Sequence, residues 1–374
     1  MTDNAPRTTR RLLSRISAEG ELHAWIEQCD VPPPGPGEII VQMEASPIHS
    51  SDMNVMFGPA DFSKAVQSGT DAAPEIRAPL RPGALESQKL RIGHLIEPGM
   101  EGAGTVLDAG KGAQQLIGKR VAVWGKSTYR DIQMFDASGC MELSDDVSLE
   151  DGAAAFVNPL TALGLLTTAK AEGYTAFVNT AAASNIGRMM IHLCREDGLA
   201  LVSVVRRSEL ADQLRALGAE HVINTSASDA NEQLVKAIDE TGARACFDAV
   251  GGKLTGQVLE GMETSCRRSL TEFSNYGSRE QRQCYIYGAL DMSPIEIPRS
   301  AGLFWSCRGW LLFPYLETLG ADETDKLLAR VRAGLGTTFK GQFSNRIGLS
   351  DVLRLDTINT FLARGTESKT LITA

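Results

Sequence analysis

Residues 177–193, which read FVNTAAASNIGRMMIHL, constrain the fold of this chain more than any other segment. A short apolar run is followed by a turn of very small residues and then by the start of a helix. Such a turn places the unpaired backbone N–H groups of a helix N-terminus where a phosphate can bind. Ala181, Ser184 and Gly187 stand where the dinucleotide-binding fingerprint prefers glycines. We therefore expect a pyrophosphate to lie against Ala182, Ala183, Ser184, Ile186 and Gly187.

The next apolar run, residues 200–205, ends in Arg206 and Arg207. An NAD-binding fold usually carries an acidic residue at this point, which binds the ribose 2′-hydroxyl. A guanidinium fork instead matches the charge and geometry of a 2′-phosphate. The pattern predicts NADPH as cofactor rather than NADH. The alternative is that one of the arginines is only a solvated residue at the start of a helix.

Strand and helix patterns alternate between residues 175 and 290. This alternation predicts parallel strands joined by right-handed crossovers, with the ligand beyond the carboxyl ends of the strands. The expected strands are residues 176–179, 201–205, 221–224, 245–249 and 285–287, and the expected helices are 186–197, 208–217, 231–239 and 253–262.

The earlier part of the chain has short alternating runs, such as residues 38–43 and 120–124, which glycines and prolines separate. This pattern is typical of an irregular β domain. Later helices at 324–334 and 349–364 and a strand at 370–373 are expected to complete that domain. The expected division is therefore 1–155 with 301–374 for the β domain, and 156–300 for the nucleotide-binding domain. Two segments resemble insertions, 61–97 and 264–283, and we expect the first to cover or narrow a substrate cleft.

Composition limits the partners and the compartment. The chain has 374 residues, 43% of them hydrophobic, and a formal net charge of −9 with no basic stripe, so no nucleic-acid partner is expected. Its seven cysteines are scattered without a CxxC pair, which disfavours a zinc ribbon and indicates a reducing compartment. The first residues lack a signal-peptide core, and no apolar run has the length of a membrane span. We predict a cytoplasmic protein.

Several motifs in order resemble the medium-chain dehydrogenase/reductase superfamily, within it the zinc-free quinone oxidoreductases and the mitochondrial-type enoyl-thioester reductases. The segments that carry this resemblance are residues 36–41 (PGEIIV), 50–52 (SSD) with Gly58, 99–106 (GMEGAGTV), 157–162 (VNPLTA), 247–252 (FDAVGG), 287–290 (YGAL) and 308–311 (RGWL). The resemblance implies a GroES-like irregular β-barrel domain joined to a Rossmann domain, and a homodimer.

The resemblance also implies a reaction. It implies NADPH-dependent, metal-free hydride transfer to a quinone or another α,β-unsaturated carbonyl. One alternative is an enoyl-thioester reductase, and another is a non-catalytic NADPH-binding sensor or structural protein. Zinc-bearing relatives carry a histidine where this chain has Met100, so His49 and Glu101 would leave only half of a zinc site.

The candidate site residues follow from these motifs. Similar enoyl-thioester reductases place a tyrosine just after the glycine equivalent to Gly58, and this chain has none there. Quinone-reducing relatives often hold Asn and Tyr where this chain has His49 and Asn54, so His49 is the candidate proton donor or carbonyl polariser. A purely structural histidine is the alternative. The resemblance further implies cofactor contacts from Asn158, Thr161, Gly251, Tyr287, Gly288 and Lys369.

Overall fold

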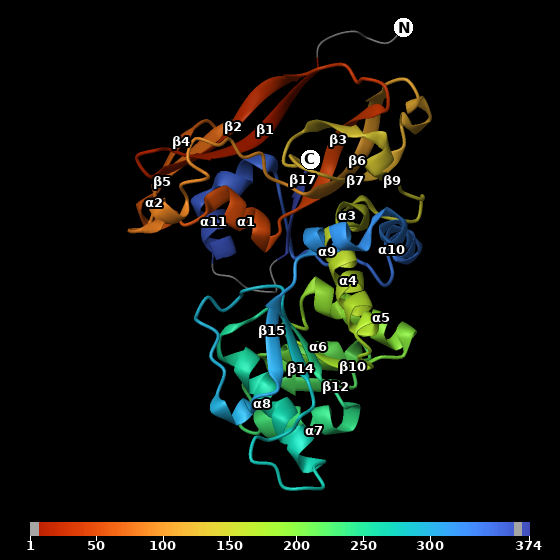
Figure 1. Ribbon diagram of the computed structural model, residues 1–374. Coiled ribbons are helices and arrows are strands. Elements are labelled where there is room, and N and C mark those ends of the chain that lie inside the picture. The colour runs from red at the N-terminus through yellow and green to blue at the C-terminus, as the bar shows by residue number, and fades with distance from the viewer. Residues whose placement is uncertain (1–6, 363–368) are drawn as a thin grey trace. The chain divides into compact units, whose positions relative to one another are not determined.

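The computed structural model describes residues 7–362 and 369–374, and the chain divides into two compact units (Figure 1). The first unit comprises Met1–Val157 and Arg332–Ala374, and the second comprises Asn158–Val331. The division differs from the expected boundary at residue 300. The reason is that β15 (Trp305–Gly309) pairs with β14 (Arg282–Ile286) and so adds a strand to the second unit.

The first unit contains two sheets. In the four-stranded sheet, which is antiparallel, the order is β1 (Arg7–Ile16), β2 (Glu21–Val31), β5 (Pro74–Pro79) and β4 (Val66–Gly69). In the other sheet the order is β16 (Asn345–Ile347), β17 (Thr370–Thr373), β3 (Glu38–Pro47), β6 (Glu101–Ala109), β7 (Arg120–Trp124) and β9 (Cys140–Glu142), with β8 (Ile132–Asp136) also paired to β3.

The 61–97 segment belongs to the framework of the first unit. Its strands β4 and β5 extend the four-stranded sheet, and Ile76 and Ala78 of β5 are buried in the same core as Leu22 of β2. That the segment also narrows a substrate cleft stays a prediction. The helices of this unit are α1 (Ser50–Phe57), α2 (Ala84–Ser87), α3 (Leu149–Ala153) and α11 (Leu355–Leu362), with 3-10 turns at Phe62–Lys64, Gln114–Leu116, Ala137–Gly139 and Leu349–Leu353.

The second unit is a six-stranded parallel sheet covered by helices. The strand order is β12 (His221–Asn224), β11 (Ala200–Val205), β10 (Ala176–Asn179), β13 (Ala245–Asp248), β14 and β15. The chain runs outward from β10 through β11 to β12 and then restarts on the other side of β10. In such doubly wound sheets the ligand crevice lies at this reversal, beyond the carboxyl ends of β10 and β13.

The helices of the second unit connect these strands, and the expected doubly wound arrangement is present. They are α4 (Val157–Ala171), which starts at the unit boundary, α5 (Asn185–Asp197), α6 (Ser208–Ala216), α7 (Ala230–Thr241), α8 (Gly252–Arg268), α9 (Leu312–Leu319) and α10 (Ala321–Gly334), which ends past the boundary, with a 3-10 turn at Arg299–Ala301. Among the described residues, no helix combines the length and the apolar character needed to cross a membrane.

Opposite faces of the parallel sheet carry different side chains. Val178, Val202 and Cys246 lie in one buried cluster with residues of α7 and α8. On the other face the Phe177 and Phe247 rings meet edge to face with centroids 5.0 Å apart. Successive side chains of a strand point to opposite faces of the sheet, and apolar ones lie on both faces. Both faces are therefore buried, as is usual for a parallel sheet.

A buried ion pair links α8 to β14 in the second unit. The Arg282 guanidinium, which is fully buried at the start of β14, contacts the Glu263 carboxylate of α8, which is 1% exposed. The same carboxylate accepts a hydrogen bond from Arg267 Nε at 2.7 Å and one from the backbone N–H of Ser278 at 3.1 Å. Glu263 therefore holds the loop between α8 and β14, which forms most of the predicted 264–283 insertion.

Replacing Arg282 by methionine should destabilise the fold strongly. The substitution leaves the Glu263 carboxylate buried without its main cation, and breaking a buried pair costs about 3–5 kcal/mol of unfolding free energy. Urea denaturation measures this loss. The control is Arg354→Met, which removes a solvent-exposed pair with Asp356 and should leave stability unchanged. Equal stabilities for the two variants would contradict the expectation.

Candidate functional site

The turn between β10 and α5 is tight and ends in a capped helix. The Ser184 hydroxyl accepts a hydrogen bond from the backbone N–H of Gly187 at 3.2 Å, which caps α5. Ala181 has φ of +49°, a conformation that side-chain-bearing residues rarely adopt. A Cβ atom at Gly187 would overlap the carbonyl of Ala182, so only glycine allows this approach. The turn therefore brings the N-terminus of α5 close behind the end of β10, with only small side chains between them.

A buried carboxylate, Asp248, holds the neighbouring strand ends at the reversal of the sheet. Its Oδ1 accepts hydrogen bonds from Thr180 Oγ1 at 2.6 Å and from the backbone N–H of Val250 at 2.8 Å and Gly251 at 3.2 Å. Its Oδ2 accepts from Thr255 Oγ1 at 2.5 Å. Asp248 thus joins the ends of β10 and β13 to the start of α8.

Asp248 belongs to the 247–252 motif, and no individual role was predicted for it. The signal was present, because an aspartate closes an apolar strand just before a Gly-Gly pair. Gly251, with φ of +81°, is the N-cap of α8, and its predicted contact with the cofactor stays a prediction.

Arg206 and Arg207 directly follow β11, next to β10 in the sheet. Both side chains are exposed, and Arg207 is the N-cap residue of α6. The carbonyl oxygen of Arg206 accepts a hydrogen bond from Ser226 Oγ at 2.5 Å, which ties this segment to the loop after β12. Two guanidinium groups at a strand end make this edge of the second unit suited to an anionic group.

Other polar groups gather near the same strand ends. The backbone N–H of Tyr287 donates to the carbonyl of Asp248 at 2.9 Å, and Gly288 lies against Ala249. Within the described part of the chain, the buried Tyr287 hydroxyl and the side-chain amides of Asn179 and Asn185 have atoms without a hydrogen-bond partner. Burial raises the pKa of Tyr287, so its hydroxyl keeps its proton. Such unpartnered atoms fit a polar ligand at this edge of the sheet.

Asn158 and Thr161 lie one turn apart at the start of α4. Both are buried, with 5% and 7% of their surface exposed. Because residues three apart share a helix face, the two polar side chains lie on the same side of α4.

In the first unit, the fully buried Glu101 carboxylate is the centre of the candidate site. Its Oε1 lies 2.7 Å from His49 Nε2, and its Oε2 accepts hydrogen bonds from the backbone N–H of Phe156 at 2.8 Å and of Val157 at 2.9 Å. A Cβ at Gly104 would overlap the carbonyl of Gln42, so a glycine there lets β6 pair closely with β3. Glu101 of β6 therefore connects His49 to the start of α4.

His49 is the N-cap residue of α1 and is 6% exposed. Its backbone N–H donates to Asp52 Oδ2 at 2.9 Å, which caps the start of the helix. Asp52 also accepts a hydrogen bond from the Tyr129 hydroxyl at 2.8 Å, and burial raises the pKa of Asp52. Asn54 lies farther along α1 with an exposed side chain, so the structure does not bring it into this buried cluster.

Lys369 lies just before β17, and the Glu101 carboxylate influences the pKa of its amino group. Burial lowers the pKa of Lys369, and the nearby Glu101 carboxylate opposes that effect. The sequence placed Lys369 among the cofactor contacts. That Lys369 contacts the cofactor stays a prediction.

The residues around His49 do not fit a zinc ion. Both Glu101 oxygens are engaged in hydrogen bonds, Lys369 adds a positive charge, and Met100 offers only a thioether. Within residues 7–362 and 369–374, no group of three or more His, Cys, Asp and Glu side chains is arranged to hold a metal ion.

Replacing Asp248 by asparagine should destabilise the second unit. An amide cannot accept hydrogen bonds on both of its atoms, so at least one buried donor loses its partner, at about 1–3 kcal/mol of unfolding free energy. Thermal or urea unfolding measures the loss, with the exposed Asp212→Asn as the matched control. A variant as stable as this control would show that the Asp248 network does not hold the strand ends.

Three comparisons place the chain among known proteins. A family model described as zinc-binding dehydrogenase matches residues 185–267. The mitochondrial enoyl-[acyl-carrier-protein] reductase of Xenopus tropicalis is 25% identical over 321 residues, which cover 82% of this chain and 78% of that protein.

Two solved structures have the same fold over nearly the whole chain. The Escherichia coli quinone oxidoreductase complexed with NADPH has a TM-score of 0.65 at 19% identity, covering 98% of this chain and 100% of that one. The Etr1p/NADP/crotonyl-CoA complex has a TM-score of 0.68 at 18% identity, with coverage of 98% and 100%.

The expected fold, a GroES-like domain with a Rossmann domain, is thereby confirmed. The matching family model and the related reductase agree with the resemblance to the medium-chain dehydrogenase/reductase superfamily that the sequence motifs carry.

Proposed function

We propose that this chain is an NADPH-dependent reductase that acts, without a metal, on a quinone or another α,β-unsaturated carbonyl. The observation that carries the proposal is the capped turn from β10 into α5, next to two exposed arginines at the end of β11. The turn suits a pyrophosphate and the arginines suit a 2′-phosphate. Relatives in which NADPH or NADP is bound support the same cofactor.

In the proposed reaction NADPH supplies the hydride, and residues of the chain bind the cofactor. When bound, NADPH supplies a hydride to the β-carbon of the activated double bond. The turn residues Ala182, Ala183, Ser184, Ile186 and Gly187 would bind the pyrophosphate, and Arg206 and Arg207 the 2′-phosphate. The unpartnered polar atoms of Asn179 and Tyr287 are further groups that a bound nucleotide could satisfy.

His49 is the residue that we assign to the substrate's carbonyl oxygen. Negative charge develops on that oxygen as hydride arrives, so a hydrogen-bond or proton donor there accelerates the reaction. Imidazole can give a proton near neutral pH, and His49 is held by a helix cap and a carboxylate rather than by bulk water. Because Asn54 is exposed, we give it the weaker assignment of a contact at the substrate's edge.

An enoyl-thioester reductase is the second candidate. The curated relative is an enoyl-[acyl-carrier-protein] reductase, and one structural neighbour holds crotonyl-CoA. Against it, the residues after Gly58 read Pro-Ala-Asp-Phe, without the tyrosine that similar enoyl-thioester reductases place there. We therefore rank quinones and enones first.

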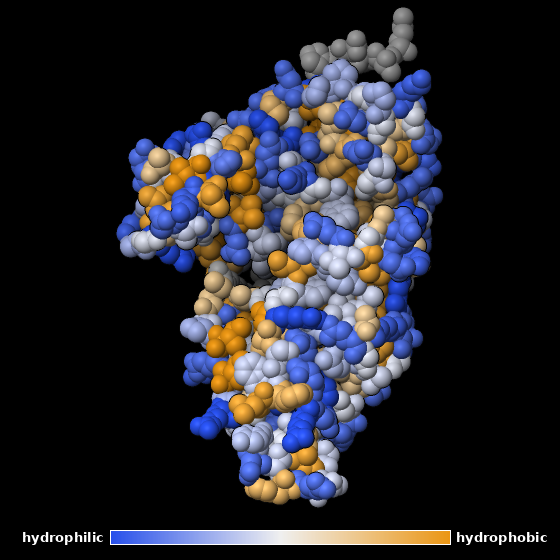
Figure 2. All heavy atoms as spheres, viewed as in Figure 1, coloured by the Kyte–Doolittle hydropathy of each residue, from blue (hydrophilic) through white to orange (hydrophobic). Residues whose placement is uncertain are grey.

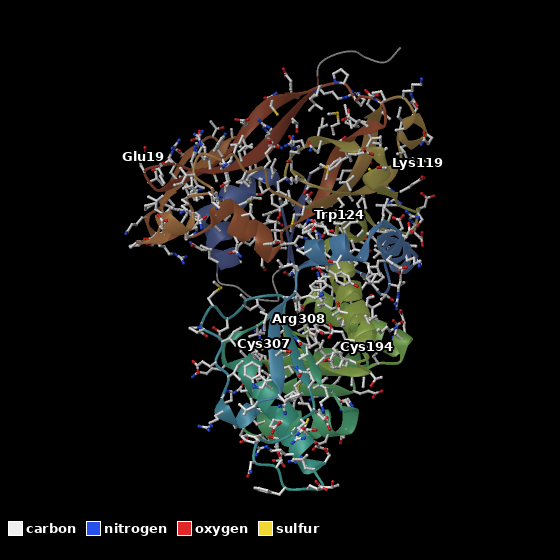
Figure 3. All side chains as sticks on the ribbon, in the orientation of Figure 1. Glu19, Lys119, Trp124, Cys194, Cys307 and Arg308 are labelled. Carbon is white, nitrogen blue, oxygen red and sulfur yellow. The ribbon has the colours of Figure 1, made fainter. Side chains whose placement is uncertain are left out.

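We also propose a homodimer formed through the edge strand β15. Cys307 and Arg308 lie on this strand (Figure 3), and among the described strands β15 has a hydrogen-bonded neighbour, β14, on one side only. Leu303, Phe304 and Leu311 flank it with 71%, 47% and 67% of their surface exposed. Figure 2 shows hydrophobic spheres in this part of the second unit. Pairing with a second copy would cover both the open strand edge and these side chains.

That the protein is cytoplasmic stays a prediction.

The experiment that tests the proposed function is NADPH oxidation with matched quinone, enone and enoyl-thioester substrates, with and without a chelator. We expect chelator-insensitive turnover of a quinone or enone, with NADPH well ahead of NADH. Turnover of the thioester alone would favour the second candidate. Tight NADPH binding without turnover of any class would indicate a sensor or structural protein instead.

Replacing Arg206 and Arg207 together by alanine should weaken the binding of NADPH but not that of NADH. Hydrogen bonds to charged groups contribute about 1.5–3 kcal/mol, which corresponds to a roughly 10–100-fold rise in the NADPH KM. The NADH KM should stay the same because NADH has no 2′-phosphate. Arg215→Ala on α6 is the control. An equal effect on both cofactors would contradict the 2′-phosphate assignment.

Replacing His49 by asparagine should lower kcat by about 10²–10⁴-fold, the usual contribution of a general acid, while NADPH binds as before. Single-turnover kinetics and a direct NADPH titration separate the two effects. The exposed His94→Asn serves as the control. Full activity of His49→Asn would remove His49 from the reaction.

A further inference from the structure

We propose that Glu101 is a positioning residue that fixes the His49 imidazole and sets which of its nitrogens serves the substrate. This inference rests on the proposed function. It is carried by the 2.7 Å contact between Glu101 Oε1 and His49 Nε2, in which both side chains are almost completely buried. The other carboxylate oxygen is held by the backbone N–H groups of Phe156 and Val157, so the carboxylate cannot rotate away.

The chemistry of the pair selects the nitrogen. An ionised carboxylate accepts hydrogen bonds but cannot donate them, so Nε2 must carry the proton in this contact. Nδ1 is then the nitrogen that takes up and releases a proton. An imidazolium formed at Nδ1 is stabilised by the adjacent carboxylate, as in other histidine and carboxylate pairs.

The proposed proton transfer balances simply. The Nδ1–H bond breaks as an O–H bond forms on the substrate oxygen, which carries the electron pair gained from hydride transfer. His49 returns to the neutral ring with Nε2–H still donated to Glu101. Solvent then restores the Nδ1 proton, and no further oxidant or reductant is needed.

Four titratable groups lie in or next to the pair formed by His49 and Glu101. Glu101 of β6 contacts the ring, and Asp52 of α1 binds the backbone N–H of His49. Tyr129, which precedes β8, donates its hydroxyl to Asp52 at 2.8 Å and to the carbonyl of Pro47 at 2.9 Å. Burial lowers the pKa of Lys369, before β17, and the Glu101 carboxylate opposes that effect.

The kinetic test is Glu101→Gln, which keeps the shape of the side chain and removes its charge. A nearby opposite charge shifts a pKa by about 1–3 units, so the pH midpoint of kcat should fall by that amount. Because the protonated ring is the active form, activity at higher pH should drop about tenfold per unit while activity at low pH recovers. The substrate KM should stay the same. A uniform loss of kcat at every pH would overturn the proposal, because a merely structural role predicts it.

A second readout needs neither cofactor nor substrate. The chain has five histidines, so ring-nitrogen NMR can follow each one, and His49→Asn identifies the His49 signal. We expect an Nε2–H tautomer in the wild type and a lower titration midpoint for the His49 signal in Glu101→Gln. An unchanged midpoint in the folded Glu101→Gln variant would overturn the inference.

These readouts separate the two proposals. Absence of NADPH-dependent turnover in the wild type would contradict the proposed function alone. A His49 signal that does not respond to position 101 would contradict the role of Glu101, even in an active enzyme. Circular dichroism of each variant verifies that it is folded.

Discussion

The first unit depends on one buried charge, the Glu101 carboxylate. An ionised carboxylate is expensive to bury unless it is paired and hydrogen-bonded. Glu101 meets this requirement with His49, two backbone N–H groups at the start of α4, and the nearby Lys369. Because these partners come from distant parts of the chain, satisfying the charge also fixes where each of them lies. The candidate catalytic histidine is thereby held as a consequence of the folding of β3, β6 and the final strand.

Asp248 performs a comparable task in the second unit. It is fully buried at the reversal of the parallel sheet, where it accepts hydrogen bonds from Thr180, Thr255 and the Val250–Gly251 backbone. These bonds shape the ends of β10 and β13, the edge at which doubly wound sheets bind their ligands. In each unit a buried carboxylate thus accepts hydrogen bonds from groups next to that unit's own candidate residues, so the same hydrogen bonds contribute to stability and to the arrangement of those residues.

Local patterns in the sequence were enough to predict most helices and strands. They did not predict which residues far apart in the chain contact one another. The strand at Ala176–Asn179, its small-residue turn and the Ser184 cap follow from adjacent residues and were predictable. β15 was missed because Trp305–Gly309 has no apolar run and gains its identity by pairing with β14. The contact of His49 with Glu101 joins residues 52 positions apart, so the sequence offered the two groups as half of a metal site without their hydrogen bond. Burial of Arg282 was equally hidden, since arginine is normally exposed.

The central claim is hydride transfer from NADPH to the β-carbon of an activated double bond. The most direct measurement is the mass and NMR analysis of the product formed from an enone and NADPH that carries deuterium at the transferred position, in ordinary water. The account predicts one deuterium at the β-carbon of the product and a solvent-derived hydrogen at the α-carbon. A reduced product without deuterium, or with deuterium at another carbon, would contradict it.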